Sequence, residues 1–202
     1  TVRSPSTVNR YLAALSTACT TGVKEWEWLE ENPVLKVSKL KEPRGRIRYL
    51  DDNEREVLLT ACKGSSNPNL YTAVVLALAT GARQMEVWGL SWRDIDLQRG
   101  FITLMDTKNQ DPRSIPLRGH ALELVKEKSK VRRLDTNRLF PSKKNPLNSF
   151  DFRAPFVRAL KEAGIEDFRW HDLRHSCASY LAMEGVPMRT IAEILGHRTL
   201  QM

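Results

Sequence analysis

The most informative stretch of the sequence reads His171-Asp172-Leu173-Arg174-His175. On a helix, positions three and four apart share a face, so His171, Arg174 and His175 are expected to project together. Burying an arginine and two histidines on one stripe costs free energy unless they meet a charged ligand. The stretch therefore predicts a face that meets a charged ligand, with a solvated polar face as the alternative.

Two histidines at this spacing also fit a zinc site of the metalloprotease type. That site needs a glutamate as general base at its second position, and Asp172 stands there instead. A third ligand would have to come from His120 or His197. The pattern therefore favours a site without a metal.

Two further segments place polar side chains next to helix ends. The first, TGARQME at residues 80–86, puts Arg83 and Glu86 three positions apart on a short predicted helix. Such a pair is usually a surface ion pair of little energetic value. The second, LGH at residues 195–197, is by itself a helix C-cap followed by an exposed histidine. Taken singly, neither segment specifies a function.

Hydrophobic periodicity and capping residues predict a mainly helical chain around these segments. A first helix should begin at Ser4-Pro5 and end at Asn32-Pro33, and Asp51 with Glu54 forms a capping box for the next. Further helices are expected at about 65–80, 83–90, 120–133, 149–163, 172–184 and 188–195. Residues 94–117 read as a small antiparallel sheet, with Pro116 suited only to an edge or a strand end. The predicted fold class is mainly α with one small antiparallel β-sheet (α+β).

Composition divides the chain into three parts. Residues 36–48 lack apolar periodicity and carry six Lys or Arg against one Glu, which is typical of a basic linker. Residues 1–35 and 49–202 are then expected to be separate packed units. Because the chain begins at Thr1 without a methionine and stops soon after a helical pattern, both ends are expected to be cut from a longer protein.

The charge balance favours a polyanionic partner. Lys and Arg number 32 against 24 Asp and Glu, a formal net charge of +8, which points to nucleic acid before membrane. The longest strongly apolar run, residues 73–79, is too short to span a bilayer, and no signal peptide opens the chain. Three widely spaced cysteines indicate reduced thiols. Secreted, membrane-spanning and disulfide-scaffold proteins are thereby excluded, and a cytoplasmic protein is expected.

Taken together, the segments resemble the tyrosine recombinase family, the phage-integrase-type site-specific recombinases. The matching stretches are TGARQMEVWGL at 80–90, DTKN at 106–109, HDLRH at 171–175 and LGH at 195–197, in that order. The resemblance covers about residues 45–202 and implies the tyrosine recombinase catalytic-domain fold for 49–202. Residues 4–33 resemble the last helix of the core-DNA-binding domain, so 1–35 would be its C-terminal remnant.

The resemblance also implies a role for each residue of the site. Arg83 and Arg174 would clamp the non-bridging oxygens of the scissile phosphate, which the planar guanidinium fits better than an ammonium. His171 would exchange a proton with the attacking nucleophile, and Lys108 would protonate the departing 5′ oxygen. His197 would donate a hydrogen bond to the developing charge.

Two supporting residues complete the implied site. Glu86 would orient it, and His175 would lie among the active-site residues, with simple packing beside Arg174 as the alternative. No metal and no cofactor are expected, because two arginines and a lysine supply the positive charge that Mg²⁺ supplies elsewhere.

The nucleophilic tyrosine of the family is expected shortly after the LGH segment at 195–197. All four tyrosines of the chain precede that point: Tyr11, Tyr49, Tyr71 and Tyr180. Tyr180 shares a predicted helix with His171, but nine residues at about 100° each put it on the opposite face. Tyr180 is therefore expected in the core, and the nucleophile is expected to be missing from this chain.

The implied function is site-specific DNA recombination, by strand cleavage and rejoining through a 3′-phosphotyrosyl intermediate. A type IB topoisomerase and a DNA-binding regulator that has lost cleavage are the alternatives. The expected partners are double-stranded DNA and further recombinase subunits, a tetramer in synapsis, at the nucleoid of a prokaryote or in a phage-derived setting. The linker residues Arg44, Arg46 and Arg48 are expected to contact DNA, whereas Trp88, Trp92 and Trp170 are expected in the core rather than stacked on bases.

Overall fold

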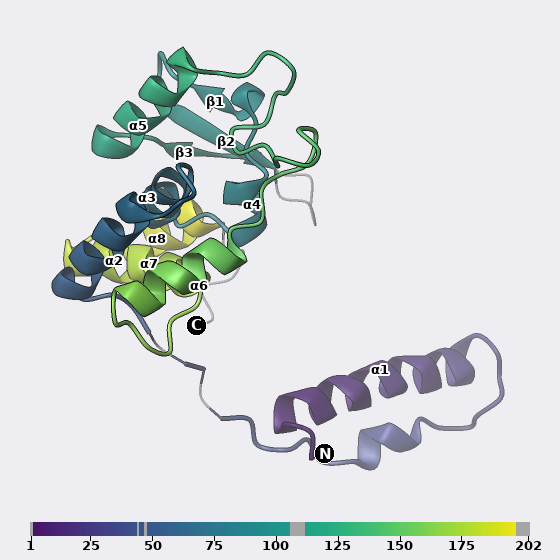
Figure 1. Ribbon diagram of the computed structural model, residues 1–202. Coiled ribbons are helices and arrows are strands. Elements are labelled where there is room, and N and C mark those ends of the chain that lie inside the picture. Colours follow the sequence, from purple (N-terminus) through teal and green to yellow (C-terminus); the bar gives the residue numbers. More distant parts are fainter. Residues whose placement is uncertain (1, 44, 47, 106–111, 197–202) are drawn as a thin grey trace. The chain divides into compact units, whose positions relative to one another are not determined.

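The computed structural model describes residues 2–43, 45–46, 48–105 and 112–196 (Figure 1). The chain forms two compact units, Thr1–Arg46 and Ile47–Met202. Among the described residues, no helix has both the length and the apolar character that a membrane crossing requires.

The first unit consists of helix α1 (Pro5–Lys24) and a returning segment with the short 3-10 helix η1 (Pro33–Lys36). The side chain of Ser4 caps α1, and Pro5 occupies its first turn, as the sequence predicts. Two asparagines tie the returning segment to α1. The Asn32 amide donates to the Ser16 carbonyl oxygen (2.9 Å), and the Asn9 amide donates to that of Leu40 (2.8 Å).

This unit has almost no apolar core of its own. Its buried described residues are Asn9, Gly22 and Asn32, whereas Tyr11 and Leu15 on α1 are 59% and 54% exposed. A helix of 20 residues with exposed apolar side chains is typical of an element that packs against a further partner.

The predicted end of this helix was wrong, because α1 stops at Lys24 rather than at Asn32. The amides of Trp26 and Trp28 donate back to the carbonyls of Thr21 and Gly22, and Glu27 takes a positive φ of 54°. These hydrogen bonds turn the chain away from the helix axis well before Pro33.

The second unit holds the core and seven α-helices among its described residues. They are α2 (Asp52–Gly64), α3 (Leu70–Thr80), α4 (Gln84–Trp88), α5 (Gly119–Lys130), α6 (Arg153–Glu162), α7 (Asp172–Met183) and α8 (Met188–Leu195). The predicted capping box of Asp51 and Glu54 is present at the start of α2. Helix α3 is buried along most of its length and packs against α2, α5 and α7. It is therefore the central helix of the unit.

The predicted antiparallel sheet is confirmed. Strands β1 (Ile95–Asp96), β2 (Phe101–Met105) and β3 (Pro112–Pro116) pair in the order β1-β2-β3, with Ile102 opposite Ile115. Pro116 lies on the edge strand β3, where the missing amide is tolerated. The sheet lies on one side of the unit and helices α2, α6, α7 and α8 on the other, with α4 between them (Figure 1). The expected fold class, mainly α with one small antiparallel sheet, is therefore correct.

Candidate active site

The start of α7 carries the three polar residues that the spacing predicts on one face. His171 and His175 reach the surface, and their rings meet edge to face with centroids 5.1 Å apart. Arg174 lies between them in sequence but is only 5% exposed. The carboxylate of Asp172 accepts from the Arg169 amide (2.7 Å), which fixes the first turn of the helix. The helix thus presents two imidazoles at the surface beside a buried guanidinium.

Arg174 connects three segments that are distant in sequence. Its Nη1 donates to the Gly81 carbonyl oxygen (2.8 Å) at the end of α3, and its Nη2 donates to that of Leu195 (2.6 Å) at the end of α8. Gly81 has φ +60°, and a side chain there would meet Leu195 and Cys177, so this position requires glycine. Burial, followed by the charges of nearby arginines, lowers the pKa of Arg174 to about 10. The guanidinium therefore remains charged at neutral pH.

Directly after this glycine turn, Arg83 is the N-cap residue of α4 and Glu86 lies in the first turn of that helix. One carboxylate oxygen of Glu86 accepts from the Arg83 backbone amide (2.6 Å), and the other accepts from Arg83 Nη1 (3.0 Å). The side chain of Arg83 is 41% exposed, whereas that of Glu86 is 13% exposed. Glu86 thus holds both the backbone amide and the guanidinium of Arg83, whereas a surface ion pair would hold the guanidinium alone.

A third arginine, Arg113 on β3, joins the site although the sequence reasoning did not select it. Its Nη1 and Nη2 donate to the two oxygens of Glu86, at 3.1 and 2.6 Å, and its side chain is 13% exposed. The available signal was strand alternation, because Arg113 shares a face with buried Ile115. An arginine on the inward face of a strand predicts a buried acidic partner.

These side chains make one cluster with an excess of positive charge. Its three guanidiniums and one carboxylate leave a net charge of +2 when the imidazoles are neutral. We call Arg83, Glu86, Arg113 and Arg174 the arginine cluster. Burial raises the pKa of Glu86, but hydrogen bonds from Arg113 and the Arg83 amide outweigh it and leave this pKa below its ordinary value. The carboxylate is therefore ionised at neutral pH.

His171 lies beside the arginine cluster. Partial burial, then the charges of His175 and Arg174, lower the pKa of His171 below its ordinary value of 6.5. The imidazole is therefore neutral at pH 7 and can accept a proton.

Three predicted residues, Lys108, His197 and Arg44, lie outside the described residues. Lys108 belongs to the connection between β2 and β3, and His197 directly follows Gly196. The described flanks of both connections adjoin the arginine cluster, through Arg113 on β3 and through Leu195 at the end of α8.

The linker arginines differ in their surroundings. The guanidinium of Arg48 pairs with both oxygens of Glu54, donates to the Tyr49 carbonyl oxygen (2.6 Å) and lies 5.3 Å from the centre of the Phe168 ring. Arg46 is half-buried at the end of the first unit. DNA contact by these residues stays a prediction, and at Arg48 it competes with an internal ion pair.

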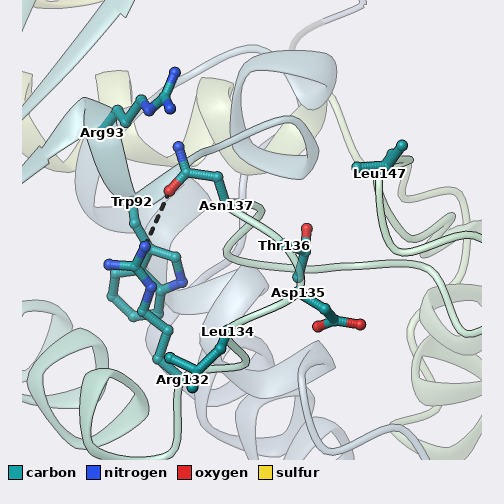
Figure 2. A pocket seen from close by; sticks show the side chains of 8 residues that line it. All are labelled: Trp92, Arg93, Arg132, Leu134, Asp135, Thr136, Asn137 and Leu147. Atoms are coloured by element: carbon teal, nitrogen blue, oxygen red, sulfur yellow. Dashed lines mark hydrogen bonds between the residues drawn. The ribbon is translucent and has the colours of Figure 1, made fainter.

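Of the three tryptophans expected in the core, two are buried there and the third, partly buried, lines a pocket. Trp88 and Trp170 are buried with their ring centroids 5.2 Å apart, as expected. Trp92 lines a pocket with Arg93, Arg132, Leu134, Asp135, Thr136, Asn137 and Leu147 (Figure 2). There the Arg132 guanidinium lies over the indole at 5.5 Å and donates to the side-chain oxygen of Asn137 (3.2 Å). The predicted site residues do not line this pocket.

The part of the chain that the structure describes contains no group of three or more His, Cys, Asp or Glu side chains placed to hold a metal ion. His120, considered above as a zinc ligand, instead makes a hydrogen bond through Nε2 with the Tyr71 hydroxyl (2.9 Å).

Comparison with known proteins adds the family. The profile of the phage integrase family matches residues 48–202. The chain belongs to the phage integrase family. The integrase of Salmonella phage P22 is 32% identical to it over 193 residues, which are 89% of this chain and 48% of that protein. This chain spans about half the length of the first curated relatives it matches.

Solved structures agree with this phage integrase assignment. The catalytic domain of bacteriophage HP1 integrase is 29% identical, with a TM-score of 0.62 over 78% of this chain and 84% of that one. The Tn1549 transposon integrase, in complex with a circular intermediate DNA, is 21% identical, with a TM-score of 0.82 over 98% of this chain and 73% of that one. The fold of the second unit is therefore the tyrosine recombinase catalytic-domain fold.

The four tyrosines of the chain make contacts that do not involve the arginine cluster among the described residues. The Tyr180 hydroxyl donates to the Leu50 carbonyl oxygen (2.9 Å), and burial raises its pKa. Tyr71 contacts His120, whereas Tyr11 and Tyr49 are exposed. Tyr180 is thus half-buried and hydrogen-bonded within the fold.

Proposed function

We propose that this chain is the catalytic part of a site-specific DNA recombinase, which cleaves and rejoins DNA strands through a 3′-phosphotyrosyl link. The observation that carries the proposal is the arginine cluster, in which Arg83 and Arg174 come from distant segments to one site of net positive charge. A phosphodiester is an anion, and more negative charge develops on its oxygens as a nucleophile adds. Family membership supports the same chemistry.

In the proposed step, a tyrosine oxygen forms a bond to phosphorus while the bond from phosphorus to the 5′ oxygen breaks. The tyrosine proton goes to His171, whose lowered pKa keeps it neutral and able to accept. Lys108 gives a proton to the departing 5′ oxygen, and His197 donates a hydrogen bond to the phosphate. Attack by another 5′ hydroxyl restores a phosphodiester and frees the tyrosine, so the bond energy is conserved without ATP.

The nucleophile in this proposal comes from outside these 202 residues. All four tyrosines precede the LGH segment at 195–197, and the Tyr180 hydroxyl is engaged with Leu50. We therefore expect the 202-residue chain to form no covalent adduct with a nicked suicide DNA substrate. The same chain extended through the next tyrosine of its gene should form one.

Tyr180→Phe in the extended chain is the matched control, because it removes a hydroxyl and little else. Adduct formation should persist in it. An adduct formed by the 202-residue chain itself would overturn the assignment of the nucleophile. No adduct from the extended chain would instead favour a DNA-binding regulator, and relaxation of supercoils without exchange between two sites would favour a topoisomerase.

The role of Lys108 has a separate test in the extended chain. General acid catalysis contributes about 10²–10⁴-fold, so Lys108→Ala should slow cleavage by that order. A substrate with sulfur in place of the 5′ bridging oxygen releases a thiolate that needs almost no proton. Cleavage of that substrate should become nearly insensitive to Lys108→Ala, while Arg174→Ala should stay slow on both substrates. Sulfur rescue of neither variant would move the proton donor to another group, with His171 the first to examine.

The first unit has its own place in the proposal. Residues 1–35 would be the C-terminal remnant of a core-DNA-binding domain, 36–48 the linker and 49–202 the catalytic domain. The exposed apolar side chains of α1 support a missing packing partner. Double-stranded DNA would be the substrate, bound by a tetramer of subunits during synapsis.

The linker contacts are tested by salt dependence. Arg44, Arg46 and Arg48 should each be changed to Gln, and affinity for duplex DNA measured from low to high salt. Removing one arginine that binds a phosphate should reduce the slope of log affinity against log salt by about one unit. An unchanged slope would mean that the arginine does not contact a phosphate. Arg48 is the most informative of the three, because its ion pair with Glu54 competes with a DNA contact.

A further inference from the structure

One carboxylate in the arginine cluster serves two guanidiniums. Both oxygens of Glu86 accept from Arg113, and each also accepts one bond from Arg83, through its backbone amide or its Nη1. The carboxylate therefore has four donors for its roughly four lone-pair sites. Any change in one partner alters how strongly Glu86 holds the other.

Arg113 is fixed from a second side as well. Gly196, with φ +71°, lies so close that a side chain there would come within 2.9 Å of Arg113 Nη1 and 3.1 Å of its Cδ. The guanidinium is thus confined between the Glu86 carboxylate and the backbone at Gly196. The residue after this glycine is His197.

Arg113 and Arg83 bind the Glu86 carboxylate to different extents. Its side chain is 13% exposed and both Nη atoms bond to Glu86, whereas Arg83 is 41% exposed and gives only Nη1 to the same carboxylate. A guanidinium has five donors, so Arg83 keeps most of its donors for a ligand. The charge of Arg113 is compensated by the Glu86 carboxylate, whereas the carbonyl partners of Arg174 are neutral and leave its charge uncompensated. Arg113 therefore acts on the charge and geometry of Glu86 and Arg83.

We infer that Arg113 is a positioning residue, which shares the Glu86 carboxylate with Arg83 and so keeps the outer donors of Arg83 aimed at the scissile phosphate. The inference rests on the proposed recombinase function of the same site. Without Arg113, Arg83 would be the one cation among the described residues that bonds to this ionised, largely buried carboxylate. Attraction would then draw the Arg83 guanidinium toward Glu86 and away from the phosphate.

The test uses single-turnover adduct formation by the chain extended through its next tyrosine. Arg113→Met should slow adduct formation by about 10²-fold, the size of effect expected from a displaced catalytic group, with DNA affinity unchanged. Arg113→Lys should recover part of the rate, because it restores the charge without the bidentate fork. The control is Arg118→Met, which removes an arginine that bonds to the Gly100 carbonyl oxygen near the same sheet. It should cleave at the wild-type rate.

The double variant Arg113→Met/Glu86→Gln separates positioning from a loss of fold. Neutralising Glu86 removes the attraction that misplaces Arg83, so the double variant should be about tenfold faster than Arg113→Met alone. A mere structural defect would make the double variant equal to or slower than either single variant, and that result would overturn the inference.

A second readout needs no DNA and uses the 202-residue chain. The pKa of Glu86, followed by carbon NMR of its carboxyl group, should lie below the ordinary range and rise in Arg113→Met. An unchanged Glu86 pKa, or an Arg113→Met variant that cleaves normally, would overturn the inference alone. A wild-type extended chain that forms no adduct would instead overturn the proposed function, and the inference with it.

Discussion

Arg174 and Arg83 carry the same guanidinium, yet the protein holds them in different ways. On the α7 side, Arg174 is buried and bonds to the carbonyl oxygens of Gly81 and Leu195. On the α4 side, Arg83 is 41% exposed and bonds to the Glu86 carboxylate, which it shares with Arg113. The first arginine is held by backbone at two helix ends, and the second by a side chain.

Because of this difference, Arg174 should contribute mainly to the stability of the fold, and Arg83 mainly to the chemistry of the site. Backbone carbonyls at helix ends cannot move without disturbing the helices, so Arg174 is part of the packed structure as well as of the site. A carboxylate between two cations can bond more strongly to one and less strongly to the other, so the position of Arg83 can be adjusted through Glu86. Substitutions on the two sides should therefore affect unfolding and cleavage in different proportions.

The largest effect on stability is expected from Arg174→Met. It leaves the carbonyls of Gly81 and Leu195 without their buried donors, which should cost about 2–4 kcal/mol in the free energy of unfolding. Urea denaturation of the 202-residue chain measures this. Arg174→Lys should restore part of it, since an ammonium reaches one carbonyl. A loss below about 1 kcal/mol would show that Arg174 does not hold the two helix ends together.

Tyr180→Phe should have a smaller effect on the same side of the molecule. It removes one hydrogen bond to the Leu50 carbonyl oxygen, which is worth about 1 kcal/mol. Urea denaturation of this variant, beside Ser176→Ala at the Leu50 amide, would show whether α7 secures the entry of the chain into the second unit. If neither variant loses stability, the α7 side owes its stability to Arg174 and apolar packing alone.

Much of this architecture follows from local sequence signals. The capping box at Asp51, the glycine turn at Gly81 and the proline on the edge strand each predict a boundary that the structure contains. Apolar periodicity fails where the backbone hydrogen bonds of a turn decide the outcome. The end of α1 depends on backbone bonds that fold the chain back to Thr21 and Gly22, which periodicity does not reveal.

The residues of the site likewise divide into those that local spacing in the sequence reveals and those that it does not. His171, Arg174 and the pair of Arg83 with Glu86 stand in short segments with readable spacing, and the structure brings them together. Arg113 was missed because its role depends on a carboxylate 27 positions away in sequence. Lys108 and His197 lie outside the described residues, so their roles stay proposals.

Arg83→Met should have the opposite profile to Arg174→Met. Because Arg83 is partly exposed and paired at the surface, its loss should change the free energy of unfolding by no more than about 1 kcal/mol. Cleavage by the extended chain should fall by about 10²–10³-fold, the cost of removing one donor that stabilises developing charge. Denaturation and adduct assays on the same preparations would show the contrast. Equal losses of stability in the two variants would remove it.

The smallest expected effect is on the titration of His171, which can be measured without DNA. Partial burial, then the charges of His175 and Arg174, disfavour the imidazolium, so the pKa of His171 should lie below 6.5. The lowered pKa means that the unfolded chain binds the proton more readily. The contribution of His171 to stability is therefore present above pH 6.5 and is lost as the pH falls through the folded-state pKa.

Proton–carbon NMR of the imidazole in the 202-residue chain would follow this titration directly. The charge of Arg174 lowers the pKa of His171 more than that of Arg83 does, so Arg174→Met should raise it further than Arg83→Met. His175→Gln provides the reference, since the charge of His175 acts most strongly among these neighbours. A larger rise in Arg83→Met would mean that Arg83 affects the pKa of His171 more than Arg174 does. Proton transfer at His171 would then depend on the exposed arginine that bonds to Glu86, and not on the buried arginine that bonds to the helix ends.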